Sequence, residues 1–142
     1  MTIILRNKDT LEVDEFVFKC CVGKNGLSFN KKEGDKKTPK GIFNLGHLYF
    51  RADKIKKIKT NLKLIKINKN CSHEKLFRKD TKYDLLIPIK YNFDKIIPGK
   101  GSCIFIHLTS DYESTAGCVA LKKKDFLILL KLINKNTKII IG

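Results

Sequence analysis

The sequence predicts one mainly β domain, built from a mixed sheet with one or two short helices. The chain has 142 residues, the usual size of a single domain and enough to bury a hydrophobic core. Its apolar residues fall mostly in short runs separated by Asn, Asp, Gly and Pro, which is typical of strands and turns. One segment, residues 122–134, has a clear helical period. With no internal repeat, linker or low-complexity stretch, residues 1–142 are expected to form a single domain.

Four strands are expected in the first 50 residues. Residues 3–5 are the apolar run Ile-Ile-Leu, which ends at a polar turn. Residues 16–22 are apolar apart from one lysine and stop at a glycine, and residues 27–29 alternate between apolar and polar. Residues 41–50 follow a Thr-Pro-Lys turn and are rich in the aromatic and branched side chains that strands favour.

Three more strands are expected before the helix. Residues 62–67 alternate lysines with aliphatic residues, which predicts one solvated face and one buried face. Residues 85–89 are apolar throughout, as in a buried strand. Residues 103–107 form an apolar run that ends in His107, so that this side chain is expected at the rim of a sheet.

The clearest helix covers residues 122–134, because its apolar residues recur every three or four positions. These residues are Phe126, Leu127, Leu129, Leu130 and Ile133. Asn134-Lys135-Asn136 is a suitable end for this helix. Residues 137–141 then form a final strand, and a short helix at residues 72–77 is a further possibility.

The net charge of +16 arises from 30 Lys and Arg against 14 Asp and Glu. Such a charge attracts polyanions, whether nucleic acid, anionic lipid or an acidic wall polymer, but a lysine-rich composition with solvated faces explains it as well. The chain has no helix-turn-helix or zinc-finger spacing, no aromatic-rich strand of the RNA-binding type, and only three arginines. We therefore do not expect specific nucleic-acid binding.

The chain contains no stretch of membrane-spanning length and no signal peptide at its start. As written, the protein is expected to be a cytoplasmic monomer. A leader that had been removed would instead place it in the periplasm or cell wall.

The five cysteines are an odd number without the density of a disulfide scaffold, which favours reduced thiols. The adjacent Cys20 and Cys21 are expected to point to opposite faces of a strand. A metal site could be assembled from Cys71, His73, Cys103 and His107, but this spacing matches no familiar zinc pattern. No metal or cofactor is therefore expected, and His47, which has no partner in sequence, is expected to be structural.

Cys118 is the strongest candidate for a nucleophile. It follows Gly117 directly, and His107 lies eleven residues upstream. An imidazole favours the thiolate, and a glycine permits a bend that turns backbone N–H groups toward one point, as an oxyanion requires. A helix that starts after Leu121 would bring its amino end near Cys118 and lower the pKa of the thiol. The alternative is a buried structural cysteine beside an ordinary strand-end histidine.

Several motifs, in this order, resemble the YkuD-like L,D-transpeptidase family. They are Val22-Gly23-Lys24-Asn25-Gly26, Thr38-Pro39-Lys40-Gly41-Ile42-Phe43, Gly101-Ser102-Cys103-Ile104-Phe105-Ile106-His107 and Thr115-Ala116-Gly117-Cys118-Val119-Ala120-Leu121. The last two are similar to a small branch with the patterns Gly-Ser-x-Ile-Phe-x-His and Thr-x-Gly-Cys-Val-Ala-Leu. Two positions depart from the common pattern, because Ala116 replaces a His and Ala120 replaces an Arg or Asn, so substrate recognition is expected to differ.

The resemblance implies a β-sandwich-like mixed sheet with the cysteine in a cleft. It assigns catalysis to Cys118 and His107, with the Leu108 carbonyl orienting the imidazole and the N–H groups of Gly117 and Cys118 binding the oxyanion. The substrate-binding residues that we expect are Arg78, Tyr83, Tyr91, Asn92, Thr115 and Ala116.

The reaction that the resemblance implies is attack by Cys118 on the bond between diaminopimelate and a terminal D-alanine in a peptidoglycan stem. The thioacyl enzyme then transfers the stem to the side-chain amine of a second stem, which makes a cross-link. Hydrolysis of the thioacyl enzyme, as in an L,D-carboxypeptidase, and a different stem register are the alternatives. A catalytically inactive relative that binds the wall or a partner is a further possibility.

Overall fold

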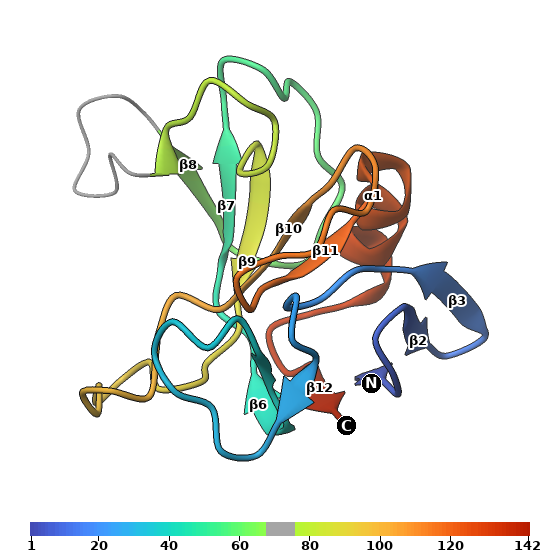
Figure 1. The fold of residues 1–142 in the computed structure, drawn as a ribbon. Coiled ribbons are helices and arrows are strands. Elements are labelled where there is room, and N and C mark those ends of the chain that lie inside the picture. The colour runs from blue at the N-terminus through green and yellow to red at the C-terminus, as the bar shows by residue number, and fades with distance from the viewer. Residues whose placement is uncertain (68–75) are drawn as a thin grey trace.

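The computed structural model describes residues 1–67 and 76–142, which form two five-stranded sheets, a small two-stranded sheet and a helix (Figure 1). The first sheet contains β1 (Thr2–Leu5), β2 (Thr10–Val13), β3 (Phe16–Lys19), β6 (Gly41–Asn44) and β12 (Lys138–Ile141). The second contains β7 (Leu48–Arg51), β8 (Leu64–Ile67), β9 (Leu85–Pro88), β10 (Phe105–Leu108) and β11 (Val119–Leu121). The remaining elements are β4 (Leu27–Ser28), β5 (Thr38–Pro39) and α1 (Lys123–Leu132).

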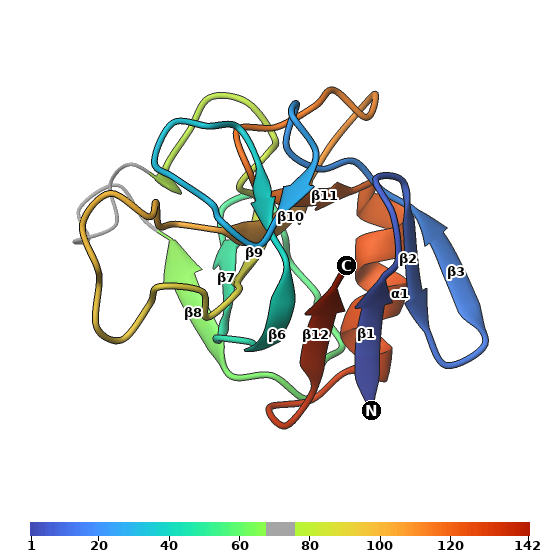
Figure 2. The same cartoon turned by 60° about the horizontal axis from the view of Figure 1, so that its bottom comes forward.

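The first sheet has the order β3-β2-β1-β12-β6 and joins the two ends of the chain. β1 and β12 lie side by side in parallel, with Ile3 opposite Ile139 and Leu5 opposite Ile141 (Figure 2). These four residues are almost fully buried, because alternate side chains of each strand face the core.

The second sheet has the order β11-β10-β9-β7-β8 and carries the candidate nucleophile and base. β10 pairs antiparallel with β9 and parallel with β11, so that His107 lies opposite Ala120. All four residues of β9 are buried, as expected of a strand inside the sheet. β11 is an edge strand of this sheet, and Cys118 precedes it directly.

A single hydrophobic core includes residues from both large sheets and from α1. Phe126, Leu129 and Leu130 of α1 have no exposed surface and lie on one face of the helix. The mainly β fold with mixed parallel and antiparallel pairing, predicted from the sequence, is confirmed.

Several boundaries differ from the prediction. The expected strand at residues 41–50 is two strands, because the chain passes from the first sheet in β6 to the second in β7. At this corner Gly46 N–H donates to the Pro88 carbonyl.

Other elements are also shorter than predicted. The expected strand at 16–22 ends as β3 at Lys19, and α1 is shorter than predicted. β2 and β11 were not predicted from the sequence. Most of the possible helix at 72–77 lies outside the described residues.

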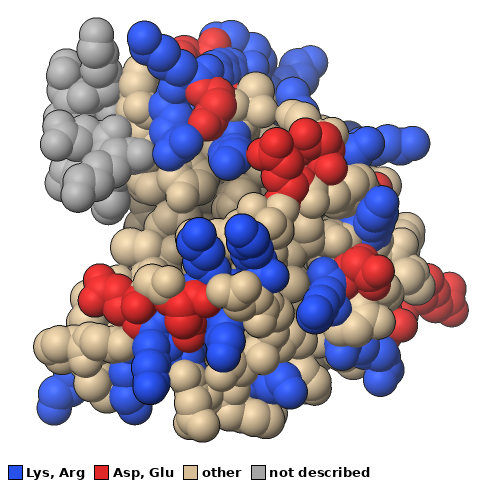
Figure 3. Space-filling model, in the orientation of Figure 1, with Lys and Arg blue, Asp and Glu red and all other residues tan. Residues whose placement is uncertain are grey.

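On the face of the molecule drawn in Figure 3, lysine and arginine side chains are spread out rather than gathered in one patch. Figure 3 shows them on one face with acidic side chains among them. Within the described residues no helix has the length and apolar character that a membrane crossing requires.

The burial of Phe126 predicts a large loss of stability on truncation. Phe126→Ala is expected to lower the free energy of unfolding by about 3–5 kcal/mol, because it leaves a cavity where α1 packs on the core. Urea unfolding followed by circular dichroism measures this change. Lys124→Ala on the exposed face of the same helix is the control, with an expected change within about 0.5 kcal/mol. Equal effects of the two variants would contradict the packing described for α1.

Candidate active site

Cys118 and His107 line one cleft of about 390 Å³ beside the end of β10. The connection between β10 and β11 forms one wall, and the segment before β9 forms the other. The first wall contains Thr109, Ser110, Asp111, Glu113, Ser114, Thr115 and Ala116, and the second contains Arg78, Asp80, Thr81, Lys82 and Tyr83.

The parallel pairing of β10 and β11 brings the cysteine to the strand that carries the histidine. Ile106 lies opposite Val119, so Cys118 reaches the level of Phe105. The Phe105 N–H donates to Cys118 Sγ at 3.3 Å, and Sγ lies 3.5 Å from the Cys103 carbonyl oxygen. Within the described residues, the hydrogen bonds of the thiol are therefore to the backbone of this segment and not to the imidazole.

His107 is buried and held in one orientation. Its Nδ1 lies 2.8 Å from the Leu108 carbonyl oxygen. A carbonyl oxygen can only accept, so Nδ1 carries the proton and Nε2 has a free lone pair. The Tyr83 ring packs edge-on against the imidazole with centroids 5.5 Å apart. Burial lowers the pKa of His107 below 6.5, so the imidazole is neutral at pH 7 and able to accept a proton.

The thiol of Cys118 is not ionised by its surroundings. Burial raises its pKa to about 11, although the Phe105 N–H and the charge of Lys31 act in the opposite direction. The sequence led us to expect a lowered pKa from the amino end of α1. The structure differs because β11 intervenes before α1 begins at Lys123, and desolvation outweighs the favourable groups.

The turn before Cys118 depends on Gly117. Its φ is +145°, and a methyl group there would lie 3.0 Å from the Lys37 carbonyl oxygen. The Thr115 hydroxyl closes the turn, because it accepts the Gly117 N–H at 3.0 Å and donates to the Cys118 carbonyl at 2.6 Å. The Gly117 N–H that the resemblance assigns to the oxyanion is thus bonded within the turn, which leaves the Cys118 N–H as the other assigned donor.

Thr38 connects this turn to the amino-terminal part of the chain. Its fully buried hydroxyl donates to the Gly117 carbonyl at 2.8 Å and accepts the Gly23 N–H at 2.9 Å. The backbone of Thr115 also bonds to this part, because its N–H donates to Val22 and its carbonyl accepts from Lys24. From the sequence, Thr38 was expected only to form a turn into a strand, so its position in the site was missed.

Arg78 and Tyr83 are two of the expected substrate-binding residues that line the cleft. Arg78 donates to the Asp80 carboxylate at 2.6–3.0 Å, and its guanidinium lies 5.3 Å from the centroid of the Tyr83 ring. Thr115 and Ala116 also line the cleft. Lys82, Asp111 and Glu113 belong to the same lining and were not predicted, because nothing in their local sequence distinguishes them from other surface charges.

Tyr91 and Asn92, also expected to bind substrate, are not among the residues that line this cleft. Asn92 exchanges hydrogen bonds with the backbone of Ile97 and donates to the Gly101 carbonyl. The Tyr91 hydroxyl donates to the Lys100 carbonyl at 2.8 Å. These contacts shape the loop between residues 92 and 101, which explains why polar residues occur there.

The metal site considered from the sequence cannot be assembled from described residues, because Cys71 and His73 lie outside them. In the described parts of the chain, no three His, Cys, Asp or Glu residues are grouped to hold a metal ion. Cys20 and Cys21 are buried free thiols, and Cys103 is an exposed one. His47 lies in a separate groove of about 610 Å³.

Comparisons with known proteins give the same picture of the fold. The family model described as the L,D-transpeptidase catalytic domain, YkuD, matches residues 1–141. A search of curated protein sequences finds no match.

Two solved structures with this fold are Bd1075 of Bdellovibrio bacteriovorus and the helical cell shape determining protein Pgp2 of Campylobacter jejuni. Bd1075 has a TM-score of 0.57 at 19% identity over 99% of this chain and 47% of its own. Pgp2 has a TM-score of 0.58 at 18% identity over 99% of this chain and 46% of its own. The chain thus spans less than half the length of these proteins.

The hydrogen bonds of Thr38 predict that its hydroxyl stabilises the fold. Thr38→Val keeps the shape of the side chain but leaves the buried Gly23 N–H and Gly117 carbonyl without this partner. The free energy of unfolding is expected to fall by about 1–3 kcal/mol, as measured by urea unfolding. Thr38→Ser retains the hydroxyl and is expected to lose less. A larger loss in the serine variant would show that packing of the methyl group matters more than the hydrogen bonds.

The raised pKa of Cys118 predicts slow alkylation at neutral pH. The thiolate fraction rises about tenfold per pH unit below a pKa of about 11, so alkylation by iodoacetamide should still be rising at pH 9.5. Residue-resolved mass spectrometry of the Cys118 peptide measures the rate, with free glutathione as the reference thiol. A rate that levels off below pH 8 would show that the resting thiol is ionised instead.

Proposed function

The chain belongs to the YkuD family of L,D-transpeptidase catalytic domains, and we propose that it is an active acyltransferase in which Cys118 attacks peptidoglycan stem peptides. Family membership supports a peptidoglycan substrate. The observation that carries the catalytic proposal is the shared cleft, in which a glycine-turn thiol and a buried, oriented imidazole both meet solvent-accessible space.

In the first step of the proposed mechanism, His107 Nε2 takes the proton of Cys118 as Sγ attacks the carbonyl carbon of the scissile peptide bond. A neutral thiol and a neutral imidazole are the right starting forms for this transfer. Burial raises the pKa of Cys118 and lowers that of His107, and both shifts favour the neutral forms. The Cys118 N–H is the donor that we propose for the oxyanion of the tetrahedral intermediate.

The C–N bond then breaks. His107 gives its proton to the leaving amine of D-alanine, and the stem remains on Sγ as a thioester. An acceptor amine attacks this thioester, its proton passes to His107, and the thiol is restored when that proton returns to Sγ. Water in place of the amine gives the shortened stem and no cross-link.

The charges that line the cleft suit a zwitterionic stem. Arg78 and Lys82 are available for carboxylates, and Asp111 and Glu113 for an amine. Arg78 takes on added importance because Ala120, where relatives often have Arg or Asn, is completely buried between His107 and Cys21. We propose that Arg78 is the arginine that meets a stem carboxylate, partly released from Asp80.

Where the protein acts determines which stems it meets. Wall-borne stems lie outside the cytoplasmic membrane, whereas stems released during wall turnover can be trimmed inside the cell. The soluble disaccharide-tetrapeptide represents both sources in an experiment.

The direct test is mass spectrometry of disaccharide-tetrapeptide after incubation with the protein. Loss of D-alanine with a dimeric product is expected for a transpeptidase, and tripeptide without dimer for a carboxypeptidase. Cys118→Ala should give no product, and His107→Gln should slow the reaction about 10²–10⁴-fold.

The matched control is His47→Gln, which makes the same chemical change in a groove without Cys118 and should leave the rate unchanged. Absence of product from the unmodified protein, with stems of either register, would overturn the proposal. A Cys118→Ala variant that retained turnover would overturn the assigned nucleophile.

A further inference from the structure

Lys31 is an almost completely buried lysine outside the cleft. Only 4% of its side chain is exposed, although lysine is rarely buried without a specific partner. It lies against two glycines, Gly101 of the loop after Asn92 and Gly117 of the turn before Cys118. A methyl group on Gly101 would stand 3.1 Å from Lys31 Cε, and one on Gly117 would stand 3.4 Å from Lys31 Nζ. The ammonium group therefore lies next to the residue that precedes Cys118.

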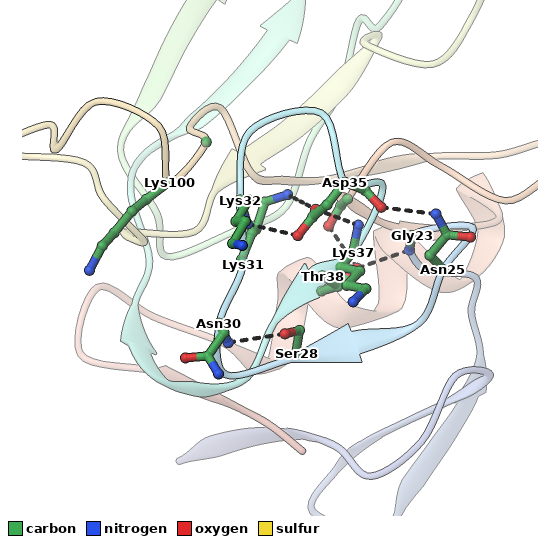
Figure 4. A network of polar contacts seen from close by, with 12 residues as sticks. Gly23, Asn25, Ser28, Asn30, Lys31, Lys32, Asp35, Lys37, Thr38 and Lys100 are labelled. Atoms are coloured by element: carbon green, nitrogen blue, oxygen red, sulfur yellow. Dashed lines mark hydrogen bonds and ion pairs between the residues drawn. The ribbon is translucent and has the colours of Figure 1, made fainter.

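Asp35 holds this ammonium in place. Lys31 Nζ donates to Asp35 Oδ1 at 2.9 Å (Figure 4). The same carboxylate accepts the backbone N–H groups of Lys32 at 2.7 Å and Lys37 at 2.9 Å. Burial raises the pKa of Asp35, but these donors together lower it to about 2. The carboxylate is ionised at neutral pH, and its charge is shared between the ammonium and two amide dipoles.

This arrangement leaves the ammonium with positive potential toward the Gly117 turn. Because the backbone N–H groups satisfy part of the Asp35 charge, the ion pair is not a closed neutral unit. The surroundings of Cys118 exclude much of the water, so a fixed charge beside the Gly117 turn acts more strongly on the thiol than it would in water.

We propose that Lys31 is a positioning residue whose ammonium stabilises the thiolate of Cys118 from behind the Gly117 turn. The inference rests on the proposed function, because it takes Cys118 as the nucleophile. Titratable and charged groups in the same cleft as Cys118 are Arg78, Asp80, Lys82, Tyr83, His107, Asp111 and Glu113, and the charges that act on the pKa of Cys118 are those of Cys103 and Lys31. Lys31 is the cation among those that act on the pKa of Cys118, and it lowers that pKa against the effects of burial and of Cys103.

The proposal explains how a desolvated thiol remains usable. Burial protects Sγ but opposes its ionisation, and His107 can take the proton only if the resulting thiolate is tolerated. A cation anchored beneath the turn lowers that cost without occupying the cleft, so the space in front of Sγ stays open for the substrate.

Alkylation of Cys118 by iodoacetamide between pH 7 and 9 tests the proposal without any peptidoglycan. Lys31→Met and Lys31→Gln both remove the charge, and the glutamine amide can still donate to Asp35. Each variant is expected to react about three- to tenfold more slowly at Cys118 than the unmodified protein, because less thiolate forms. A purely structural role predicts the opposite, since loosening the turn hydrates the thiol and speeds its reaction.

Lys32→Met is the matched control, because it removes one positive charge from an exposed neighbour and should leave the rate unchanged. Cleavage after Lys100, Glu113 and Lys122 separates the Cys118 peptide from that of Cys103. Thermal melting shows which of the two Lys31 variants remains folded. If Lys31→Met unfolds, the alkylation rate of Lys31→Gln is the one that tests the proposal. An unchanged or faster reaction in a folded Lys31 variant overturns the proposal. Since this readout needs no stem peptide, failure of the turnover assay and failure of the Lys31 effect are separate results.

Discussion

The geometry of the site depends on the two hydrogen bonds of the Thr38 hydroxyl. This hydroxyl connects Gly23 to Gly117, two residues that belong to opposite ends of the chain. Because neither glycine has a side chain, the segments that contain Gly23, Thr38 and Gly117 approach closely enough for one hydroxyl to bond to both glycine backbones. A methyl group on Gly23 would lie 2.5 Å from the Lys36 carbonyl oxygen, so this approach requires glycine there. The position of Cys118, the proposed nucleophile, therefore follows from backbone contacts of the Gly117 turn.

The topology of the second sheet explains why the cleft forms where it does. Parallel neighbours such as β10 and β11 cannot be joined by a tight hairpin, so the chain must leave the end of β10 and return to the start of β11. Residues 109–118 make this return and form one wall of the cleft. His107, the proposed base, lies near the end of the first strand, and Cys118, the proposed nucleophile, lies just before the second. A rigid sheet thus positions a loop that carries the chemistry.

Burial decides the electrostatic character of the pair. A thiolate beside an imidazolium would place two charges where water is scarce, which is costly. The structure instead raises the pKa of Cys118 and lowers that of His107, so the resting pair is neutral. The network of Lys31 and Asp35 lies behind this neutral pair and supplies a fixed positive potential. The resting thiol of such a site is weakly nucleophilic, because it stays protonated until a substrate is bound.

The sequence by itself determined the mainly β class, the helix around Phe126 and the choice of Cys118 and His107 as residues that share a cleft, since these depend on local periodicity and on residue chemistry. It also indicated Arg78 and Tyr83 as neighbours of the cleft. Only the tertiary structure placed the Thr38 hydroxyl and the Lys31 ammonium beside Gly117, because Gly117 lies far along the chain from both and a hydroxyl or ammonium has no local signature of burial. It also moved Tyr91 and Asn92 to a separate loop and reversed the expected direction of the thiol pKa. The desolvation that shifts the pKa of a group depends on all the residues that pack around it, and the sequence near that group does not reveal which residues these are.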